Sequence, residues 1–445
     1  MHILKIIHGY PLRYNAGSEV YSQSICHELS RQHQVSIFTR EENPFRPDFE
    51  LREEEETPNR RLYLANMPRG KDGYRHPQLD ARFGALLDRL RPDIAHIGHL
   101  NHLSTGLADE LHARRIPIVF TLHDFWLMCP RGQFLQRNFG EAGALYRVCE
   151  GQDDRKCAVT CYPMYFSGRA QDRPDEEAYW TRWIAARMAE TRALAGKVAR
   201  FIAPSRYLQE RFVRDFGLPA DRVQYLDYGF PLQYLTPGIA KSSDTAAGGG
   251  LLTFGYIGTH IPAKGIHHLI EAFGQVQGPA RLRIWGRPRA QETDALQALA
   301  QSVAAPEKPV EWMGEYVNHH IANHVFARCD GIVVASIWGE NSPLVIHEAQ
   351  ACRVPVITAD YGGMQEYVRH QENGLLFPHR DPAGLARQMQ WAADHPAEFL
   401  RLGQRGYLYA PDGRIPDIET HCQQLMHIYH QTLQQHGNHL LETHA

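Results

Sequence analysis

The sequence predicts an α/β protein with two doubly wound parallel-sheet domains. Three observations predict this class. The chain of 445 residues is too long for one compact core and suits two domains of roughly 200 residues. Short apolar runs rich in Ile, Val and Phe alternate with stretches of helical period in both halves, which is typical of repeated βα units. Between the halves, residues 231–250 are rich in Pro, Gly, Ser and Ala, which predicts a linker.

The composition excludes several classes of protein. Hydrophobic residues make up 43% and charged residues 22% of the chain, a globular balance that excludes a mainly disordered protein. A formal net charge of −3 lacks the basic excess expected of a nucleic-acid-binding protein. No apolar run approaches the roughly 18 residues of a membrane helix. The first residues show no signal-peptide pattern, so we expect a cytoplasmic location.

The first half, residues 1–230, contains the predicted elements of the N-terminal domain. Apolar runs predict strands at 2–7, 34–39, 61–65, 93–97, 116–122 and 200–204. Helical periodicity predicts helices at 18–31, 77–90, 104–113 and 205–214. The acidic segment ELREEEETP (50–58) is interpreted as a solvated loop.

The second half repeats the pattern over residues 251–415. Strands are predicted at 251–257, 281–285, 309–313, 331–336 and 354–358, and helices at 264–276, 290–303, 318–327, 343–352 and 382–395. A last amphipathic stretch, 416–435, predicts a helix within a C-terminal segment (416–445) that packs back towards the N-terminal domain. Two such domains favour a working site in a cleft between them.

Glycine and polar residues gather where the predicted strands end. Gly9 and Gly17 follow the first strand, and His99 and His123 follow two later ones. In the second half the corresponding residues are Gly258, Lys264, Gly286, Gly314 and the segments 337–343 and 361–363. Ligands of open parallel sheets bind beyond the carboxyl ends of the strands, where helix N-termini offer free N–H groups. This distribution indicates a phosphate-bearing ligand.

The segment SIWGENSPLVIHEAQACRVPVITADYGG (336–363) is the most informative. Ser342 and Pro343 predict a helix N-cap and first helical residue, which puts Glu340 in the loop before the helix. Glu348 lies within the helix among apolar neighbours. Its carboxylate either faces solvent or accepts hydrogen bonds from two adjacent hydroxyls, as a ribose offers, and position alone favours neither interpretation.

Glu340 and Glu348, spaced E-x7-E, resemble the signature of the retaining glycosyltransferases of family 4. The resemblance extends along the chain through AGSEVYSQSICHEL (16–29), TLHDFW (121–126), IAPSRYL (202–208), GYIGTHIPAKGIHHLIEAF (255–273) and VITADYGGMQEYVRHQENGLLF (356–377). It implies the GT-B fold, in which two Rossmann-like doubly wound domains face a cleft. The domain at 251–415 would bind the nucleotide-sugar and the domain at 1–230 the acceptor.

The resemblance also implies an activity. A sugar would pass from a UDP- or GDP-sugar to a saccharide or lipid-linked glycan acceptor, with retention of the anomeric configuration and without an obligatory catalytic metal. A bacterial surface-polysaccharide setting, at the inner face of the membrane, is expected for this type. Front-side attack, in which the departing phosphate oxygen takes the acceptor's proton, would need no general base on the protein.

Individual roles follow from the same resemblance. Lys264 would face the diphosphate, Glu340 the donor sugar, Glu348 the ribose, and His123 the reacting carbon. The implied donor-binding set is completed by Gly17, Gly258, Thr259, Asn341, Ser342, Pro343, Leu344, Gly362 and Gly363, and residues 312–317 would lie near the base. His123, Lys264 and Glu340 would be the catalytic residues.

The sequence departs from the family pattern at three places. Thr259 stands where many members carry a phosphate-binding arginine, and Ala16-Gly17 stands where two glycines are common. LDYGFP (226–231) replaces the usual PNG-x-D, which leaves the role of Asp227 open. Lys264 would then be the main phosphate cation of the second domain, with Arg206 a candidate for partial replacement.

Residues 126–175 form an insertion too long for a plain βα loop. It contains Cys129, Cys149, Cys157 and Cys161, spaced C-x19-C-x7-C-x3-C. Four thiolates suit a structural zinc, which would fold a segment too polar to build its own core. Four buried free thiols and an iron–sulfur cluster are the alternatives.

The following stretch, 176–200, carries arginines and a stripe of Trp180, Trp183, Ile184 and Met188 at helical spacing. Core packing is favoured over peripheral membrane contact for such a stripe.

Two other functions compete with the nucleotide-sugar transferase: another GT-B enzyme, such as a phosphorylase or a sugar-nucleotide epimerase, and a non-catalytic subunit that keeps the fold.

Overall fold

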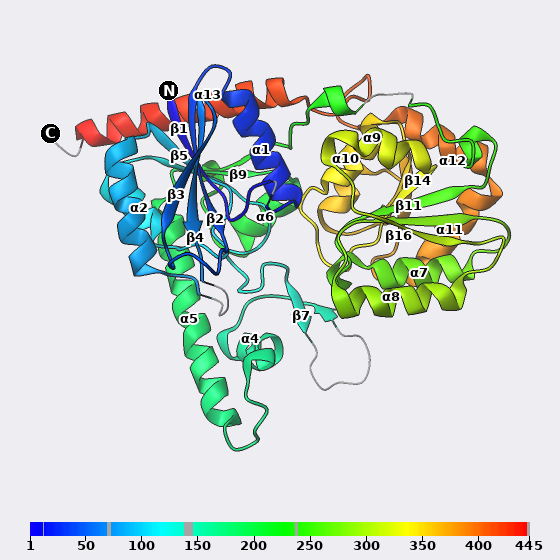
Figure 1. Ribbon diagram of the computed structural model, residues 1–445, viewed down its shortest axis with the longest axis horizontal. Coiled ribbons are helices and arrows are strands. Elements are labelled where there is room, and N and C mark those ends of the chain that lie inside the picture. The colour runs from blue at the N-terminus through cyan, green and yellow to red at the C-terminus, as the bar shows by residue number, and fades with distance from the viewer. Residues whose placement is uncertain (12, 69–72, 138–145, 236–238, 443–445) are drawn as a thin grey trace. The chain divides into compact units, whose positions relative to one another are not determined.

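The computed structural model describes residues 1–11, 13–68, 73–137, 146–235 and 239–442, with side chains as far as residue 437 (Figure 1). Three predicted segments lie partly outside the described residues, at 138–145 of the insertion, 236–238 of the linker and 443–445 of the C-terminal segment. By its internal contacts the chain divides into two compact units. Unit 1 is Met1–Gly229 with the residues from Ile418 onward, and unit 2 is Phe230–Asp417.

Unit 1 is built on a sheet of eight strands within the described residues, in the order β10-β9-β6-β5-β1-β2-β4-β3. The strands are β1 (His2–Ile6), β2 (Gln34–Glu41), β3 (Leu51–Thr57), β4 (Arg60–Asn66), β5 (Ile94–Ile97), β6 (Ile118–Thr121), β9 (Arg200–Ala203) and β10 (Val223–Tyr225). Neighbouring strands pair in parallel from β10 to β4, and β3 pairs antiparallel with β4. Because β1 lies between β2 and β5, the strand order reverses there, as in a doubly wound sheet.

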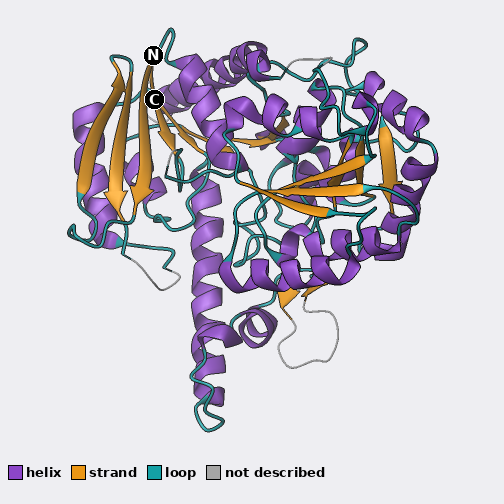
Figure 2. Ribbon diagram, turned by 45° about the vertical axis from the view of Figure 1, so that its right-hand side comes forward, coloured by secondary structure: helices purple, strands orange, loops and turns teal. Residues whose placement is uncertain are grey.

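Helices cover this sheet (Figure 2). They are α1 (Gly17–Leu29), α2 (Pro77–Leu90), α3 (Leu107–Ala113), α5 (Arg173–Lys197), α6 (Arg206–Arg214) and α13 (Ile418–Glu442). One more helix, α4 (Asp154–Cys161), belongs to the insertion and packs on α5. A small antiparallel ribbon of β7 (Leu135–Arg137) and β8 (Tyr146–Val148) belongs to the insertion. Hydrogen bonds hold α13 in unit 1, one between Tyr21 Oη and His421 Nε2 (2.8 Å) and one between His96 Nδ1 and Tyr429 Oη (2.6 Å).

Unit 2 repeats the design with a parallel sheet in the order β13-β12-β11-β14-β15-β16. Its strands are β11 (Thr253–Ile257), β12 (Arg281–Trp285), β13 (Val310–Gly314), β14 (Gly331–Val334), β15 (Val356–Ala359) and β16 (Gly374–Phe377). Its helices are α7 (Ile266–Gln275), α8 (Ala290–Val303), α9 (Ile321–His324), α10 (Leu344–Ala351), α11 (Pro382–Asp394) and α12 (Pro396–Leu402). The predicted fold class, two doubly wound parallel-sheet units, is confirmed.

The prediction of a solvated loop at 50–58 is wrong. Residues 51–57 form the edge strand β3, antiparallel to β4. Cross-strand ion pairs neutralise its glutamates, for example between Arg61 Nη1 and Glu53 Oε1 (2.8 Å). An edge strand tolerates such charges because one of its sides faces water, and the charges discourage pairing with another chain.

The prediction of one continuous helix at 318–327 is also wrong. Only α9 (Ile321–His324) is α-helical there, flanked by 3₁₀ turns at Asn318–His320 and Phe326–Arg328.

The apolar stripe on α5 packs in the core, as predicted. Ile184 and Met188 are buried against α4, with Trp180 and Trp183 partly buried beside them. Among the described helices, none combines the length and apolar character needed to cross a membrane.

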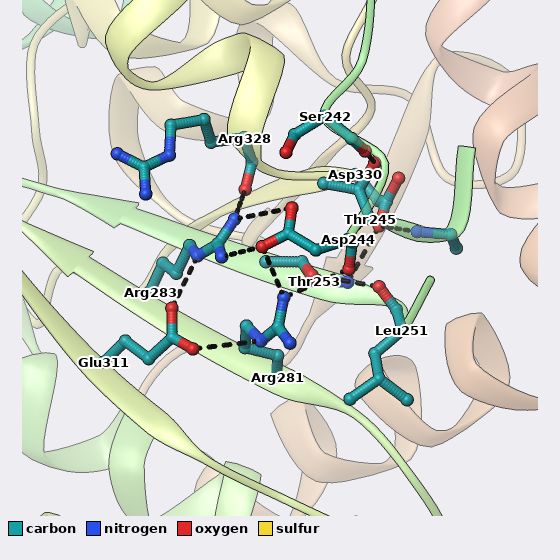
Figure 3. A network of polar contacts seen from close by, with 11 residues as sticks. Ser242, Asp244, Thr245, Leu251, Thr253, Arg281, Arg283, Glu311, Arg328 and Asp330 are labelled. Carbon is teal, nitrogen blue, oxygen red and sulfur yellow. Dashed lines mark hydrogen bonds and ion pairs between the residues drawn. The ribbon is translucent and has the colours of Figure 1, made fainter. Parts of the chain in front are cut away.

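In unit 2 a polar network fixes the segment that leads into the sheet (Figure 3). Asp244 accepts from Arg281 Nη1 (3.0 Å) and pairs with Arg283, whose guanidinium holds the pKa of this carboxyl well below its usual range. Asp330, fully buried, accepts from the backbone N–H groups of Ala246 (2.8 Å), Ala247 (3.0 Å) and Thr253 (2.9 Å). These N–H groups would otherwise bond to water, and the Asp330 carboxylate takes the place of that water in the folded chain.

Asp330→Ala is expected to lower the free energy of unfolding by about 3 kcal/mol, because three N–H groups, that of buried Thr253 among them, lose a charged acceptor. Denaturant unfolding measures the effect. Asp394→Ala, at an exposed aspartate of α11, is the matched control and should change the same free energy by less than about 0.5 kcal/mol. Equal losses in the two variants would show that Asp330 is not a fixed acceptor.

Candidate functional site

The candidate site of unit 2 lies where β11 and β14 end. Lys264 closes a 3₁₀ turn (Pro262–Lys264) after β11, and Glu340 lies in the loop after β14. β11 and β14 are neighbours in the sheet, so the loops that follow them lie side by side. The strand order reverses at β11, because β12 lies on one side of it and β14 on the other. Open α/β sheets bind ligands at this point.

Glu340 is the centre of a hydrogen-bond cluster. Its Oε1 accepts from Lys264 Nζ (2.6 Å), and also from Ser336 Oγ (2.6 Å) and Trp338 Nε1 (3.0 Å). The Glu340 side chain is 9% exposed and that of Lys264 is 34% exposed. The ammonium group is thus held in place by a buried carboxylate while part of it still faces solvent. Such a cation can attract an anion such as a diphosphate without reorganising.

Two glycines allow the loops of this cluster to approach one another. Gly265 has φ +66°, and a Cβ there would lie 1.7 Å from the carbonyl oxygen of Ala335. Gly363 donates its N–H to the carbonyl oxygen of Glu340 (2.8 Å), and a Cβ there would lie 1.3 Å from the oxygen of Asn341. Any larger residue at either position would push the loops apart.

The start of α10 differs from the prediction. Pro343 is the N-cap, with φ −63° and ψ 115°, and Leu344 is the first helical residue, so Ser342 as N-cap and Pro343 as first helical residue are wrong. The extended ψ keeps Pro343 outside the helix, because a helical residue has ψ near −42°. Asn341 and Ser342 are both buried in the loop before it.

Glu348 lies on α10 in a partly buried position. Burial raises the pKa of its carboxyl to about 7. Burial also raises the pKa of the Tyr316 phenol, and the charge of Glu348 adds to that shift, so the two groups are neighbours. A carboxyl group whose pKa is raised by burial is typical of a ligand-binding position.

The remaining predicted donor-binding residues of unit 2 surround this edge. Gly258 and Thr259 follow β11, and the carbonyl oxygen of Thr259 accepts from Tyr256 Oη (3.2 Å). Gly362, with Gly363, opens the 3₁₀ segment Gly362–Tyr367 after β15. Lys264 and Gly363 each donate a hydrogen bond to Glu340, whereas Glu348 is a neighbour of Tyr316.

Gly17 and His123 belong to unit 1. Gly17 is the first residue of α1, after an extended N-cap at Ala16. His123 follows β6, and its Nδ1 is hydrogen-bonded to Tyr228 Oη (2.6 Å). Burial, and to a smaller extent the charges of Lys5 and His99, hold the pKa of His123 well below its usual range. The imidazole is therefore neutral at physiological pH.

Sequence reasoning missed several polar partners. Ser336 and Trp338, the other donors to Glu340, directly follow β14, and that position was the available signal. Tyr228, which holds His123, lies in the segment that departs from the family pattern, so the pattern gave no signal for it. Two further polar contacts of unit 1 also went unpredicted, between His8 and Glu19 (3.3 Å) and between His99 and Asp124 (3.2 Å).

The four cysteines of the insertion come together. Cys129, Cys149, Cys157 and Cys161 line one cavity of about 10 Å³. As the side chains stand, no three His, Cys, Asp or Glu residues in the described part of the chain are arranged to hold a metal ion. The expected zinc therefore has no ready-formed site.

Comparison with known proteins gives consistent matches. Residues 16–233 match the family model described as Glycosyltransferase Family 4, and residues 251–395 match that of Glycosyl transferases group 1. The D-inositol 3-phosphate glycosyltransferase of Streptomyces bingchenggensis is 25% identical over 49% of this chain and 50% of its own length. That of Rhodococcus erythropolis is 30% identical over 43% of this chain and 45% of its own. The chain spans about half the length of these curated relatives.

Solved structures resemble the whole chain. Anabaena HepE in complex with UDP and glucose has a TM-score of 0.67 at 17% identity, covering 97% of this chain and 100% of that one. Sucrose-phosphate synthase of Thermosynechococcus elongatus has a TM-score of 0.67 at 20% identity, covering 97% and 98%. The two family models match successive parts of the chain, and the solved structures share its fold over 97% of its length. Both findings agree with the strand order of the two sheets. The chain belongs to glycosyltransferase family 4, and its two Rossmann-like units have the GT-B fold.

Proposed function

We propose that this chain is a glycosyltransferase that moves a hexose from a nucleotide-sugar to a saccharide or lipid-linked glycan acceptor, with retention of configuration and without a catalytic metal. The observation that carries the proposal is the Lys264–Glu340 pair at the point where the strand order of unit 2 reverses. HepE was solved with UDP and with UDP-glucose, which supports a UDP-sugar as the first donor to test.

In this proposal Lys264 stabilises the leaving group. Cleavage of the anomeric C–O bond leaves negative charge on the departing diphosphate, and a fixed ammonium group stabilises that charge more as it develops. Glu340 holds the ammonium group through Oε1, and its other oxygen is assigned to a hydroxyl of the donor sugar. Glu348 is assigned to the two ribose hydroxyls. The departing phosphate oxygen takes the acceptor's proton, so no side chain is assigned as general base.

For unit 1 the proposal keeps the roles that the family resemblance implies. Gly17 offers its backbone N–H to the diphosphate, and His123 contacts the donor sugar near the reacting carbon. A neutral imidazole held by Tyr228 suits hydrogen bonding to a sugar hydroxyl, because it does not add a charge beside an oxocarbenium-like carbon.

Thermal unfolding with a panel of UDP-, GDP- and ADP-sugars tests the proposal. Ligand at about 100 times its Kd should stabilise the chain by about 2.7 kcal/mol. Release of nucleoside diphosphate in the presence of acceptor glycans then tests transfer. Stabilisation by one donor together with that release supports the transferase.

The competing functions give different results. A sugar-nucleotide epimerase would change the donor without needing an acceptor. A non-catalytic subunit that has lost its site would show no shift with any nucleotide-sugar, and that result would contradict the proposal.

A further inference from the structure

The four cysteines of the insertion come from three separate segments of unit 1. Cys129 follows β6, and its N–H donates to the carbonyl oxygen of Phe125 (2.7 Å). Cys149 follows β8, and its N–H donates to the carbonyl oxygen of Phe134 (2.7 Å). Cys157 and Cys161 lie four residues apart on α4, so they share one face of that helix. These three segments thus converge on one point in unit 1.

That point is a cavity of about 10 Å³, lined by all four cysteines. Such a volume admits a single water-sized sphere. Each cysteine is at most 8% exposed, so the cavity is shielded from solvent. Thiols that served only as small hydrophobic groups would be expected to fill this space, because protein interiors are close-packed.

Cationic groups adjoin the cavity. Lys156 Nζ lies 3.2 Å from Cys149 Sγ, and Arg131 belongs to the cavity lining. Four thiolates around a divalent ion carry a net charge of −2, which needs nearby compensation when it is buried. A lysine and an arginine at the rim supply it.

We propose that the four cysteines of unit 1 bind one zinc ion, which fastens the insertion to the sheet domain. On binding, the four thiols lose four protons and form four Zn–S bonds, with no change of oxidation state. Cys149 gives up its hydrogen bond to the carbonyl oxygen of Gly151 (3.1 Å) and turns towards the cavity.

The site is structural, because four thiolates occupy every position of a tetrahedral zinc and leave none open for a substrate. It cross-links Cys129, β8 and α4, and α4 in turn packs on α5 through Ile184 and Met188. The zinc proposal does not depend on the proposed glycosyltransferase activity, and its test needs no substrate.

Metal analysis of the full chain, purified without a histidine tag or chelator from zinc-supplied cells, tests this proposal. One zinc per chain is expected. Cys157→Ser/Cys161→Ser should contain less than about a tenth of that amount. Cys329→Ser/Cys352→Ser, which removes two buried thiols of unit 2, is the matched control and should retain one zinc.

A second measurement keeps the proposal testable if the first variant does not fold. Wild-type chain freed of zinc is titrated with Co²⁺, and one equivalent should produce sulfur-to-cobalt charge-transfer bands with the visible bands of tetrahedral cobalt. Wild-type chain with neither bound zinc nor these bands would overturn the proposal. So would iron accompanied by acid-labile sulfide, which would show a cluster instead of a single ion.

Discussion

Lys264→Ala should lower kcat for sugar transfer by about 100- to 1,000-fold, the usual effect of removing one group that stabilises charge in the transition state. The structure predicts that the fold survives the change, because Glu340 keeps its hydrogen bonds from Ser336 and Trp338. The apo protein should lose less than about 1 kcal/mol, as expected for a partly exposed ion pair. Steady-state kinetics and thermal unfolding of the same preparation measure both effects.

Lys308→Ala is the control for this prediction. Lys308 is another lysine of unit 2, and its Nζ donates to the carbonyl oxygens of Gly274 (2.8 Å) and Val276 (3.0 Å), away from the candidate site. Its loss should reduce stability and leave kcat nearly unchanged. If Lys264→Ala instead loses stability and kcat together, as a structural lysine would, then Lys264 does not act on the leaving group.

Glu348→Gln should weaken nucleotide-sugar stabilisation strongly while making the apo protein more stable at pH 8. The pKa of this carboxyl is raised to about 7, above its unfolded value, so the folded chain binds more protons than the unfolded chain between about pH 4.5 and 7. Ionisation therefore costs stability as pH rises through that window. Removing the charge should restore on the order of 1 kcal/mol at pH 8 and almost nothing at pH 5.

The same carboxyl should make donor binding depend on pH. Ribose hydroxyls donate to the ionised form, so affinity for a nucleotide-sugar should rise as pH increases from 6 to 8. Glu348→Gln should remove this dependence, whereas Glu398→Gln, at an exposed glutamate of α12, should behave as wild type. Calorimetric titration measures the affinities. An affinity independent of pH in the wild type would contradict the assignment of Glu348 to the ribose.

Much of the fold could be predicted because apolar strands and helical stretches alternate so regularly. The prediction of secondary structure failed where contacts in the folded chain, rather than the local sequence pattern, determine the backbone conformation. The acidic run of β3 looks solvated in sequence, yet Arg61 and Arg52 neutralise it across and along the strands. Ser342-Pro343 looks like a helix start, but the extended backbone of Pro343 delays α10 by one residue.

The main residues of the candidate site could be predicted from the sequence, but the contacts between them could not. Lys264 and Glu340 are 76 residues apart, and their contact follows only once β11 and β14 are known to be neighbours. Tyr228 lies 105 residues from His123 and has no motif of its own. The cysteine spacing contains one wide gap, so their convergence on a single cavity needed the structure.

A crystal structure of the chain with the nucleotide-sugar that stabilises it most tests the central claim directly. The account predicts a diphosphate oxygen within hydrogen-bonding distance of Lys264 Nζ and the ribose hydroxyls on the carboxylate of Glu348. A nucleotide bound elsewhere, with Lys264 and Glu348 both out of reach of it, would contradict the account.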